Sequence, residues 1–554
     1  MAETIQRKLN DSPAARWTAL LLIASTMFFG YMFVDLMSPL QSMIEAQRGW
    51  TPDVFGMYGS SEFILNVFGF LILAGIILDK MGVRFTGQLS ASLMFIGACL
   101  KYYAVSDSFA GSGIETWLGS WWTSFPASAK LASLGFMIFG CGMEMAGITV
   151  SKAIAKWFEG KEMALAMGLE MAIARVGVFA IFSISPWLAD MAPATVVRPV
   201  AFCTVLLLIG LLTFVIFSFM DRKLDKQLGL DSRGGGGSEE EFKVSDLKYI
   251  LSSKVFWIIA FLCVLYYSAI FPIQKYAVNM LQCNLTLVPP EEGSFWASDL
   301  CTYIQYVIML VVAAGAFAFA FTKNKSVKIP GLIVAIIALV VYCVMGYMRQ
   351  SAAAIFAVFP LLAVGITPVL GSYVDHKGKA ASMLVYGALL LILCHLTFAF
   401  ILPMFKGNDV GGVAVAFLTI LVLGASFSLV PASLWPSVPK LVDSKIIGSA
   451  YALIFWIQNI GLWLFPLLIG KVLTNTNPEL AQKVAEGAMT EAEASVSYDY
   501  TWPLVMLACL GVAALFIGLY LKVVDRKKKL GLELPSIAAD KTEVDESEVV
   551  AEDL

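Results

Sequence analysis

The sequence predicts an all-α polytopic membrane protein, built from two six-helix bundles with an extra transmembrane hairpin inserted in the second. Three observations lead to this prediction: the composition, the apolar runs that recur along the whole chain, and a loop motif that occurs twice. Of the 554 residues, 59% are hydrophobic and only 14% are charged, and the mean hydropathy is +0.79. A soluble protein cannot bury that much apolar surface in its core.

Apolar runs of about 20 residues are long enough to cross a ~30 Å hydrocarbon layer as helices. We expect about fourteen such spans. Six of them form an N-terminal bundle over residues 1–220, at about 17–40, 53–78, 84–106, 131–156, 162–190 and 196–220. Eight belong to a C-terminal part over residues 255–525, at about 255–281, 302–322, 329–348, 351–374, 380–404, 411–437, 446–473 and 501–523.

Two polar segments separate and follow these parts. Residues 221–254 include four glycines starting at Gly234 and three glutamates starting at Glu239, a composition typical of a flexible linker. Residues 526–554 form a polar tail, and its part from Leu530 to Leu554 is too short and acidic to be a domain. Lysine and arginine concentrate near both termini and in alternate loops, so the positive-inside rule places the linker, the tail and both termini in the cytoplasm.

One loop motif, Gly-x-x-x-Asp-x-x-Gly followed by a basic residue, occurs in both halves. The first copy consists of Gly75, Asp79, Gly82 and Arg84, and the second consists of Gly371, Asp375, Gly378 and Lys379. Two copies at equivalent places indicate a duplicated transporter. We expect both loops to gate the cytoplasmic side, with Asp79 and Asp375 holding the bundles together when the inner gate is closed.

The second copy follows the tenth span, whereas a simple duplication would place it after the eighth. The spans at about 302–348 therefore look like an inserted hairpin. The alternative is that one or both of these segments are re-entrant or peripheral. Lysines that flank the two segments favour a full hairpin.

Several classes of site are not expected. The nine cysteines show no Cys-x-x-Cys or Cys/His spacing, and no phosphate-binding loop is present, so we expect no metal, no cofactor and no drive by ATP. No long basic stretch indicates nucleic acid. Cys283 and Cys301 flank one polar loop, and they are either a disulfide or two unrelated thiols.

The two loops resemble the signature loop of the major facilitator superfamily, and other segments resemble one branch of it. That branch includes the lysosomal dipeptide carriers and their bacterial relatives. The segments that carry this closer resemblance contain Gly142, Glu144, Gly168, Glu170, Arg175, Gly177, Tyr266, Tyr267, Pro272, Trp435, Pro436, Tyr451, Gln458 and Asn459. The resemblance implies a major facilitator fold, alternating access and a small-molecule substrate, and we expect a bacterial inner (plasma) membrane as its location.

Charged residues inside the expected spans are the main candidates for function. A charge at the centre of a membrane helix costs ~2.5–3.5 kcal/mol on insertion scales, and Asp35, Glu62, Glu144 and Arg175 fall within spans. The resemblance implies that Glu144 and Arg175 face the central cavity and bind the ammonium and the carboxylate of a dipeptide. The alternative is a buried Glu144–Arg175 ion pair with no role in binding. Asp35 is also an expected substrate contact, and Asp35 and Glu62 would each bind a proton or cap a helix.

Aromatic and amide side chains form a second group of expected substrate contacts. Its members fall in spans that line the cavity in this fold, and they are Tyr31, Tyr267, Trp435, Trp456, Gln458 and Asn459. Ordinary helix packing is the alternative for each aromatic residue. The adjacent amides need partners, because polar side chains in lipid face the protein interior.

Two functions follow from these residues, and a third is disfavoured. The first is a secondary transporter of dipeptides or related zwitterions. The second is a proton-coupled carrier of organic anions or other small metabolites, in which Arg175 binds the anion and the acids relay protons. An enzyme or a sensor would need a catalytic cluster or a soluble effector domain, and the sequence contains no sign of either.

Overall fold

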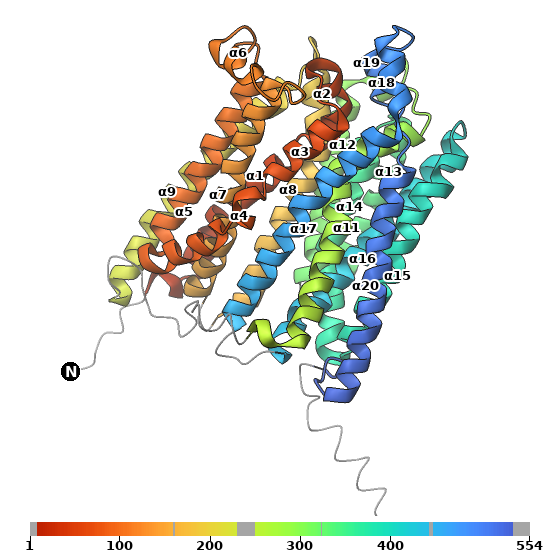
Figure 1. Cartoon of the computed structure of the whole chain (residues 1–554). Coiled ribbons are helices and arrows are strands. Elements are labelled where there is room, and N and C mark those ends of the chain that lie inside the picture. The colour runs from red at the N-terminus through yellow and green to blue at the C-terminus, as the bar shows by residue number, and fades with distance from the viewer. Residues whose placement is uncertain (1–7, 159–160, 230–249, 323, 442–446, 536–554) are drawn as a thin grey trace, which may run out of the picture.

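The computed structural model describes residues 8–158, 161–229, 250–322, 324–441 and 447–535. All regular structure within these ranges is helical (Figure 1). The helices of the first bundle are α1 (Pro13–Asp35), α3 (Pro52–Ser61), α4 (Ile64–Val67), α5 (Phe70–Val105), α7 (Ala127–Trp157), α8 (Met163–Asp190) and α9 (Val197–Leu228). The helices of the second bundle are α11 (Lys254–Asn284), α14 (Ala352–Lys377), α15 (Ala380–Leu396), α16 (Asp409–Ser437), α17 (Ile447–Thr476) and α20 (Thr501–Lys528).

The two ends of the molecule differ. One end, which we call the distal end, carries the short helices α2 (Gln41–Arg48), α6 (Gly113–Gly119), α18 (Pro478–Ala485) and α19 (Glu491–Ala494) (Figure 1). The opposite end, which we call the basic end, carries the start of α1, the end of α20 and both loop motifs.

Twelve helices of the described chain are long and apolar enough to cross a membrane. They do not include α3, α4 or α5, which occupy the places of the second and third expected spans, so the expected count of fourteen is not confirmed. The element α5 itself comprises two helices, which meet at a break at Gly82, where φ is 77°. The break coincides with the first copy of the charged loop motif, between Asp79 and Arg84.

The second expected span is itself broken near the middle of the bundle. It begins with α3, bends at Glu62, continues in α4 and turns again at Gly69, where φ is 99°. That positive φ suits glycine, which has no Cβ to clash. The bend lies against α7 because Gly140 leaves room for it: a Cβ on Gly140 would lie 1.9 Å from the carbonyl oxygen of Glu62.

The linker begins later than the sequence indicated. Helix α9 continues to Leu228, and Asp221 and Asp225 are buried in its last turns. Lys156 donates to Asp221 over 2.8 Å, and Arg84 pairs with both aspartates. These ion pairs join α5, α7 and α9 at the basic end, so residues 221–228 belong to the first bundle. Residues 230–249 of the expected linker and residues 536–554 of the expected tail lie outside the described residues.

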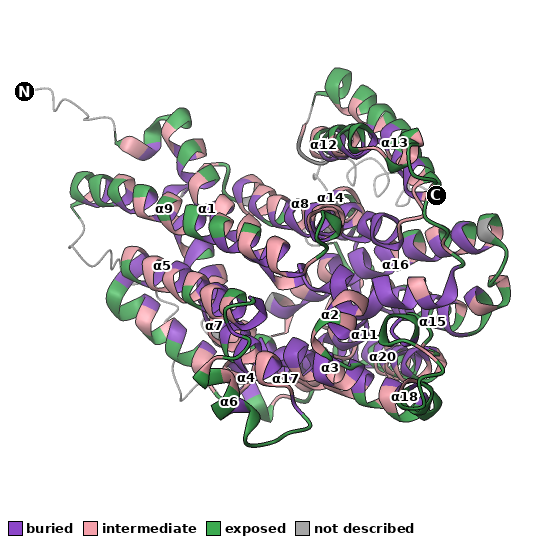
Figure 2. Ribbon diagram, turned by 90° about the horizontal axis from the view of Figure 1, so that it is seen from above, coloured by how far each residue is buried: buried purple, intermediate pink, exposed green. Residues whose placement is uncertain are grey.

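Two further helices, α12 (Asp299–Phe321) and α13 (Lys325–Met348), occupy the place expected for the inserted hairpin, and both are among the twelve candidate spans. They pack tightly on each other, since a Cβ on Gly315 would lie 2.8 Å from the Cβ of Ala335. Seen from the distal end, the pair lies at the edge of the molecule beside α8 and α14 (Figure 2). Cys283 and Cys301, near this region, are both free thiols.

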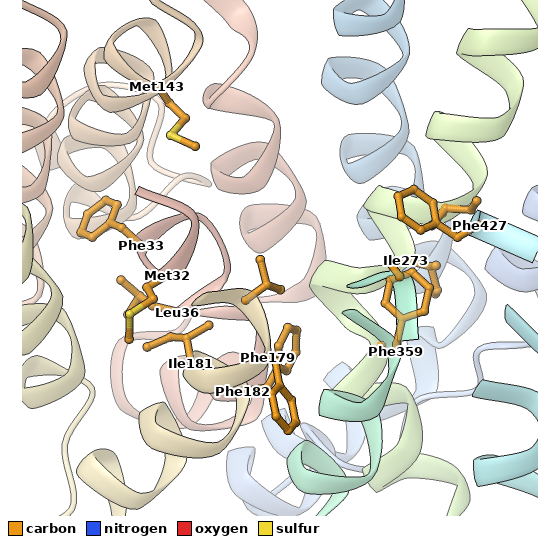
Figure 3. Packing of buried hydrophobic residues seen from close by; sticks show 14 of the residues in the cluster. Met32, Phe33, Leu36, Met143, Phe179, Ile181, Phe182, Ile273, Phe359 and Phe427 are labelled. Atoms are coloured by element: carbon orange, nitrogen blue, oxygen red, sulfur yellow. The ribbon is translucent and has the colours of Figure 1, made fainter. Parts of the chain in front are cut away.

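The bundles meet through α3 against α17 and through α8 against α14. Figure 3 shows Phe179 and Phe182 of α8 on the side of the first bundle that faces Phe359 and Phe427, and the rings of Phe182 and Phe356 lie 5.2 Å apart. Polar contacts between the bundles gather toward the distal end. They include hydrogen bonds from Ser42 to Gln282, from Tyr276 to the carbonyl of Pro52, from Thr474 to Asp53 and from Tyr498 to Glu45.

Candidate functional site

A cavity of about 220 Å³ lies between the two bundles, near the middle of the helices. Side chains from both bundles line it, and seven of the nine expected substrate contacts are among them. These seven are Tyr31, Asp35, Glu144, Arg175, Tyr267, Trp435 and Gln458. A larger hollow of about 870 Å³ opens at the distal end, but it contains none of the expected site residues.

Arg175 reaches the cavity from α8, and aromatic rings surround its guanidinium group. The guanidinium carbon lies 5.5 Å from the ring centre of Tyr31 and 5.3 Å from those of Phe271 and Phe427. Such contacts attract a cation through the ring quadrupole, and they hold the planar group in place. A close approach of α1 and α8 positions this contact, because a Cβ on Gly177 would lie 2.7 Å from the carbonyl oxygen of Phe28.

Glu144 reaches the cavity from α7. Two of the three glycines near it serve packing, since a Cβ on Gly140 or Gly142 would lie 1.9 or 2.6 Å from a neighbouring backbone oxygen, whereas Gly147 has nothing within 4 Å. Among the described residues, no ion pair joins Glu144 to Arg175. Both groups are only partly buried, so a solute in the cavity can reach each of them.

The distal wall of the cavity carries a second polar set that links the bundles. Lys275 of α11 donates to Glu62 over 3.0 Å, and both side chains are less than a tenth exposed. The preceding residue, Gln274, donates to Asp35 over 2.7 Å. Two consecutive residues of the second bundle, Gln274 and Lys275, thus bind two carboxylates of the first bundle on the distal side of the cavity.

The sequence prediction missed Gln274 and Lys275. Lys275 could have been found, because it is a charge within an apolar span, and such charges are costly unless they are paired. The prediction also missed Lys101, which is likewise a charge within an apolar span. It is fully buried, and its ammonium group lies 4.3 Å from the ring centre of Phe33 and 4.9 Å from that of Phe136.

The remaining aromatic and amide residues divide between the cavity wall and helix packing. The indole of Trp435 donates to the hydroxyl of Tyr267 over 3.1 Å at the cavity wall. Trp456 does not line the cavity; its indole donates across the bundles to the carbonyl of Val67, over 2.8 Å, at the turn that ends α4. Asn459 bonds the carbonyl of Phe455 in its own helix and also lies outside the cavity wall.

The two loop motifs share one backbone feature. Gly82 and Gly378 have φ values of 77° and 75°, a region that L side chains rarely adopt. Asp79 pairs with Lys152 of the same bundle over 2.7 Å, and the side chain of Asp375 lies outside the described residues. A Cβ on Gly75 or Gly371 would meet nothing within 4 Å, so neither glycine brings helices together in this conformation.

The second loop motif also contacts the start of the tail. The backbone amides of Lys379 and Ala380 donate to the carbonyls of Glu533 and Leu532, each over 3.1 Å. The carboxylate of Glu533 accepts from the amide and the hydroxyl of Ser382 over 2.8 and 2.9 Å. The tail therefore satisfies the free N–H groups in the first turn of α15.

The family model and the curated relatives that match this chain all describe membrane transporters. A family model described as Major Facilitator Superfamily matches residues 20–351. The proteins of Bos taurus and Homo sapiens named lysosomal dipeptide transporter MFSD1 are each 23% identical to this chain, and the matches cover 83% of this chain and 80% of the relative.

Solved structures share the fold. The nucleoside transporter NupG superposes with a TM-score of 0.54 and 13% identity, covering 91% of this chain and 99% of that one. A bacterial homologue of the human drug peptide transporters PepT1 and PepT2 superposes with a TM-score of 0.56 and 13% identity, covering 92% and 99%.

Proposed function

The chain belongs to the Major Facilitator Superfamily, and we propose that it carries dipeptides or related small zwitterions by alternating access. It is an integral, multi-pass membrane protein and a transporter rather than an enzyme. The two motif copies, one in each bundle, agree with this membership. What the proposal adds is the class of solute and the residues that bind it.

One observation carries the proposal: Glu144 and Arg175 present opposite charges to the same inter-bundle cavity without pairing with each other. A dipeptide carries an ammonium at one end and a carboxylate at the other. The guanidinium can donate two parallel hydrogen bonds to the carboxylate, while Glu144 accepts from the ammonium. A volume of about 220 Å³ is below the ~300–1,000 Å³ typical of sites for drug-sized molecules, which suits a small solute.

The names of the curated relatives support the same class of solute. They are called dipeptide transporters, at 23% identity over most of this chain. Because all peptides share the backbone ammonium and carboxylate, a site that binds those groups tolerates many side chains. We therefore expect broad specificity and modest affinity.

The arrangement of the bundles supports alternating access from an inward-facing state. Buried polar contacts such as Glu62–Lys275 close the distal side of the cavity, while Gly75 and Gly371, toward the basic end, have free space beside them. By the positive-inside rule, we propose that the basic end and both termini face the cytoplasm. A bacterial plasma membrane is our proposed location, although the curated relatives are named as lysosomal.

The second candidate function is a proton-coupled carrier of organic anions. The cation of Arg175 in the cavity favours it, and Asp35 and Glu62 are the acids that would bind protons. Three carboxylates against two cations line the cavity, however, and such a surplus repels an anion unless the acids are protonated. Transport with and without a pH gradient separates the two candidates.

The deciding experiment compares a free dipeptide with its N-acetylated form. Acetylation removes the ammonium, so Glu144→Gln should weaken binding of the free dipeptide by about tenfold or more, as expected for a charge-assisted hydrogen bond, and leave the acetylated form almost unaffected. Glu170→Gln is the matched control, because Glu170 is a buried acid of α8 that does not line the cavity. Equal losses for both ligands in Glu144→Gln would make that residue structural or a proton site.

A further inference from the structure

A second hollow, separate from the central cavity, lies on the membrane-facing side of the second bundle. It is a groove of about 320 Å³ between α12, α13 and α14, and all thirteen of its lining residues are apolar. A cavity without polar groups offers water no hydrogen bonds. Hydrocarbon is therefore the material that fits it, and the groove lies within helices that qualify as membrane spans.

The groove forms because α12 and α13 pack closely on each other but leave space where they face α14. Within the hairpin, glycine permits close contact: a Cβ on Gly315 would lie 2.8 Å from the carbonyl oxygen of Gly331. Where the hairpin faces α14, a Cβ on Gly365 would meet nothing within 4 Å. Gly365 lines the groove, so this glycine leaves open space rather than a helix contact.

Positive charge lies where the groove approaches the basic end. Phe319 lines the groove, and the ammonium group of Lys328 lies 5.0 Å from the centre of its ring. Lys325, one turn earlier in α13, is exposed. Neither lysine forms an ion pair with a described carboxylate, and the sequence from Leu300 to Val374 contains no Asp or Glu.

From this geometry we propose that the groove binds one anionic phospholipid, with an acyl chain between the hairpin and α14 and the phosphate at Lys325 and Lys328. Basic sites between membrane helices on the cytoplasmic side recognise anionic headgroups. The lipid completes the packing of the hairpin against α14, where the protein alone leaves space. This proposal is independent of the solute that the transporter carries.

The test uses the purified full chain with dioleoyl phosphatidylglycerol, which is anionic, and dioleoyl phosphatidylcholine, which has the same chains and a zwitterionic headgroup. Native mass spectrometry measures how much of each lipid stays bound. We expect the wild type to retain more phosphatidylglycerol, by about fivefold for each lysine at the membrane surface. K325Q/K328Q should abolish this preference, and G365L should lower retention of both lipids because its side chain fills the groove.

K527Q/K528Q is the control, since it removes two exposed lysines from the end of α20, at the same end of the molecule. It should keep the preference. Equal retention of both lipids by the wild type, or an equal loss in the control, would mean annular lipid only and overturn the proposal. Unchanged lipid retention in both G365L and the milder G365A would also overturn the proposal. A second copy of the chain bound in the groove in place of lipid would overturn it as well.

Discussion

Lys275 forms an ion pair with Glu62 across the two bundles, 3.0 Å from Nζ to Oε2, and the pair closes the distal wall of the cavity. The neighbouring contact from Gln274 to Asp35 extends the same closure. For the cavity to open toward the distal end, α11 must move away from both carboxylates. The pair is therefore expected to stabilise the state in which the cavity is closed at the distal end.

Breaking this pair should destabilise the observed conformation. Lys275→Met leaves the carboxylate of Glu62 buried and unpaired, which costs about 3–5 kcal/mol in a buried pair, and the thermal unfolding midpoint should fall. The matched control is Asp107→Asn, which breaks the exposed Arg48–Asp107 pair at a cost of at most about 1 kcal/mol. The swapped variant Glu62→Lys/Lys275→Glu should recover part of the loss; a swap no better than the single variant would contradict a pairwise role.

Asp79→Asn should cut transport while leaving solute binding largely intact. Asp79 lies about a third exposed beside Lys152 at the basic end, away from the cavity. Its charge is expected to act when the two bundles close at that end. Uptake into proteoliposomes and binding by thermal shift measure the two effects separately. Asp11→Asn, which removes the surface pair with Lys161 at the same end, should leave uptake near normal. Wild-type uptake in Asp79→Asn would refute the gating role.

Glu533→Ala should destabilise the start of α15. The carboxylate accepts hydrogen bonds from the amide and hydroxyl of Ser382, so it acts as a cap supplied from a distant segment. Loss of a cap costs about 1 kcal/mol. Proteolysis near residue 380 and the thermal midpoint report the change, and Glu533→Gln should be milder because its amide oxygen still accepts. An unchanged midpoint in Glu533→Ala would mean that this contact contributes nothing.

Much of the site follows from the sequence because its physical signals are local. A charge inside an apolar run is costly wherever it lies, and this rule identified Asp35, Glu62, Glu144 and Arg175, all of which line the cavity. The repeated motif likewise indicated two equivalent turns, and Gly82 and Gly378 share a positive φ.

Other features depend on partners that are distant in the sequence. Gln274 is uncharged, and only its contact with Asp35, 239 residues away, distinguishes it from other amides. The bond from Trp456 to Val67 requires the break in the second span, which exposes a carbonyl. The contact between Glu533 and the start of α15 corresponds to no periodic pattern or motif in the sequence that would predict it. Such pairings become visible only once the helices are packed.

Arg175→Lys should weaken binding of a free dipeptide by about tenfold or more, because lysine keeps the charge but loses the planar fork. The three rings around Arg175 hold that fork in one orientation, and a flexible ammonium gains less from them. A dipeptide amide, which lacks the carboxylate, is the control ligand. It should bind the wild type weakly and lose almost nothing further in the variant. Isothermal titration of both ligands to both proteins gives the four dissociation constants. If the amide loses as much affinity as the free acid, Arg175 maintains the shape of the cavity rather than binding the carboxylate, and an anchor for that end of the solute must be sought elsewhere on the cavity wall.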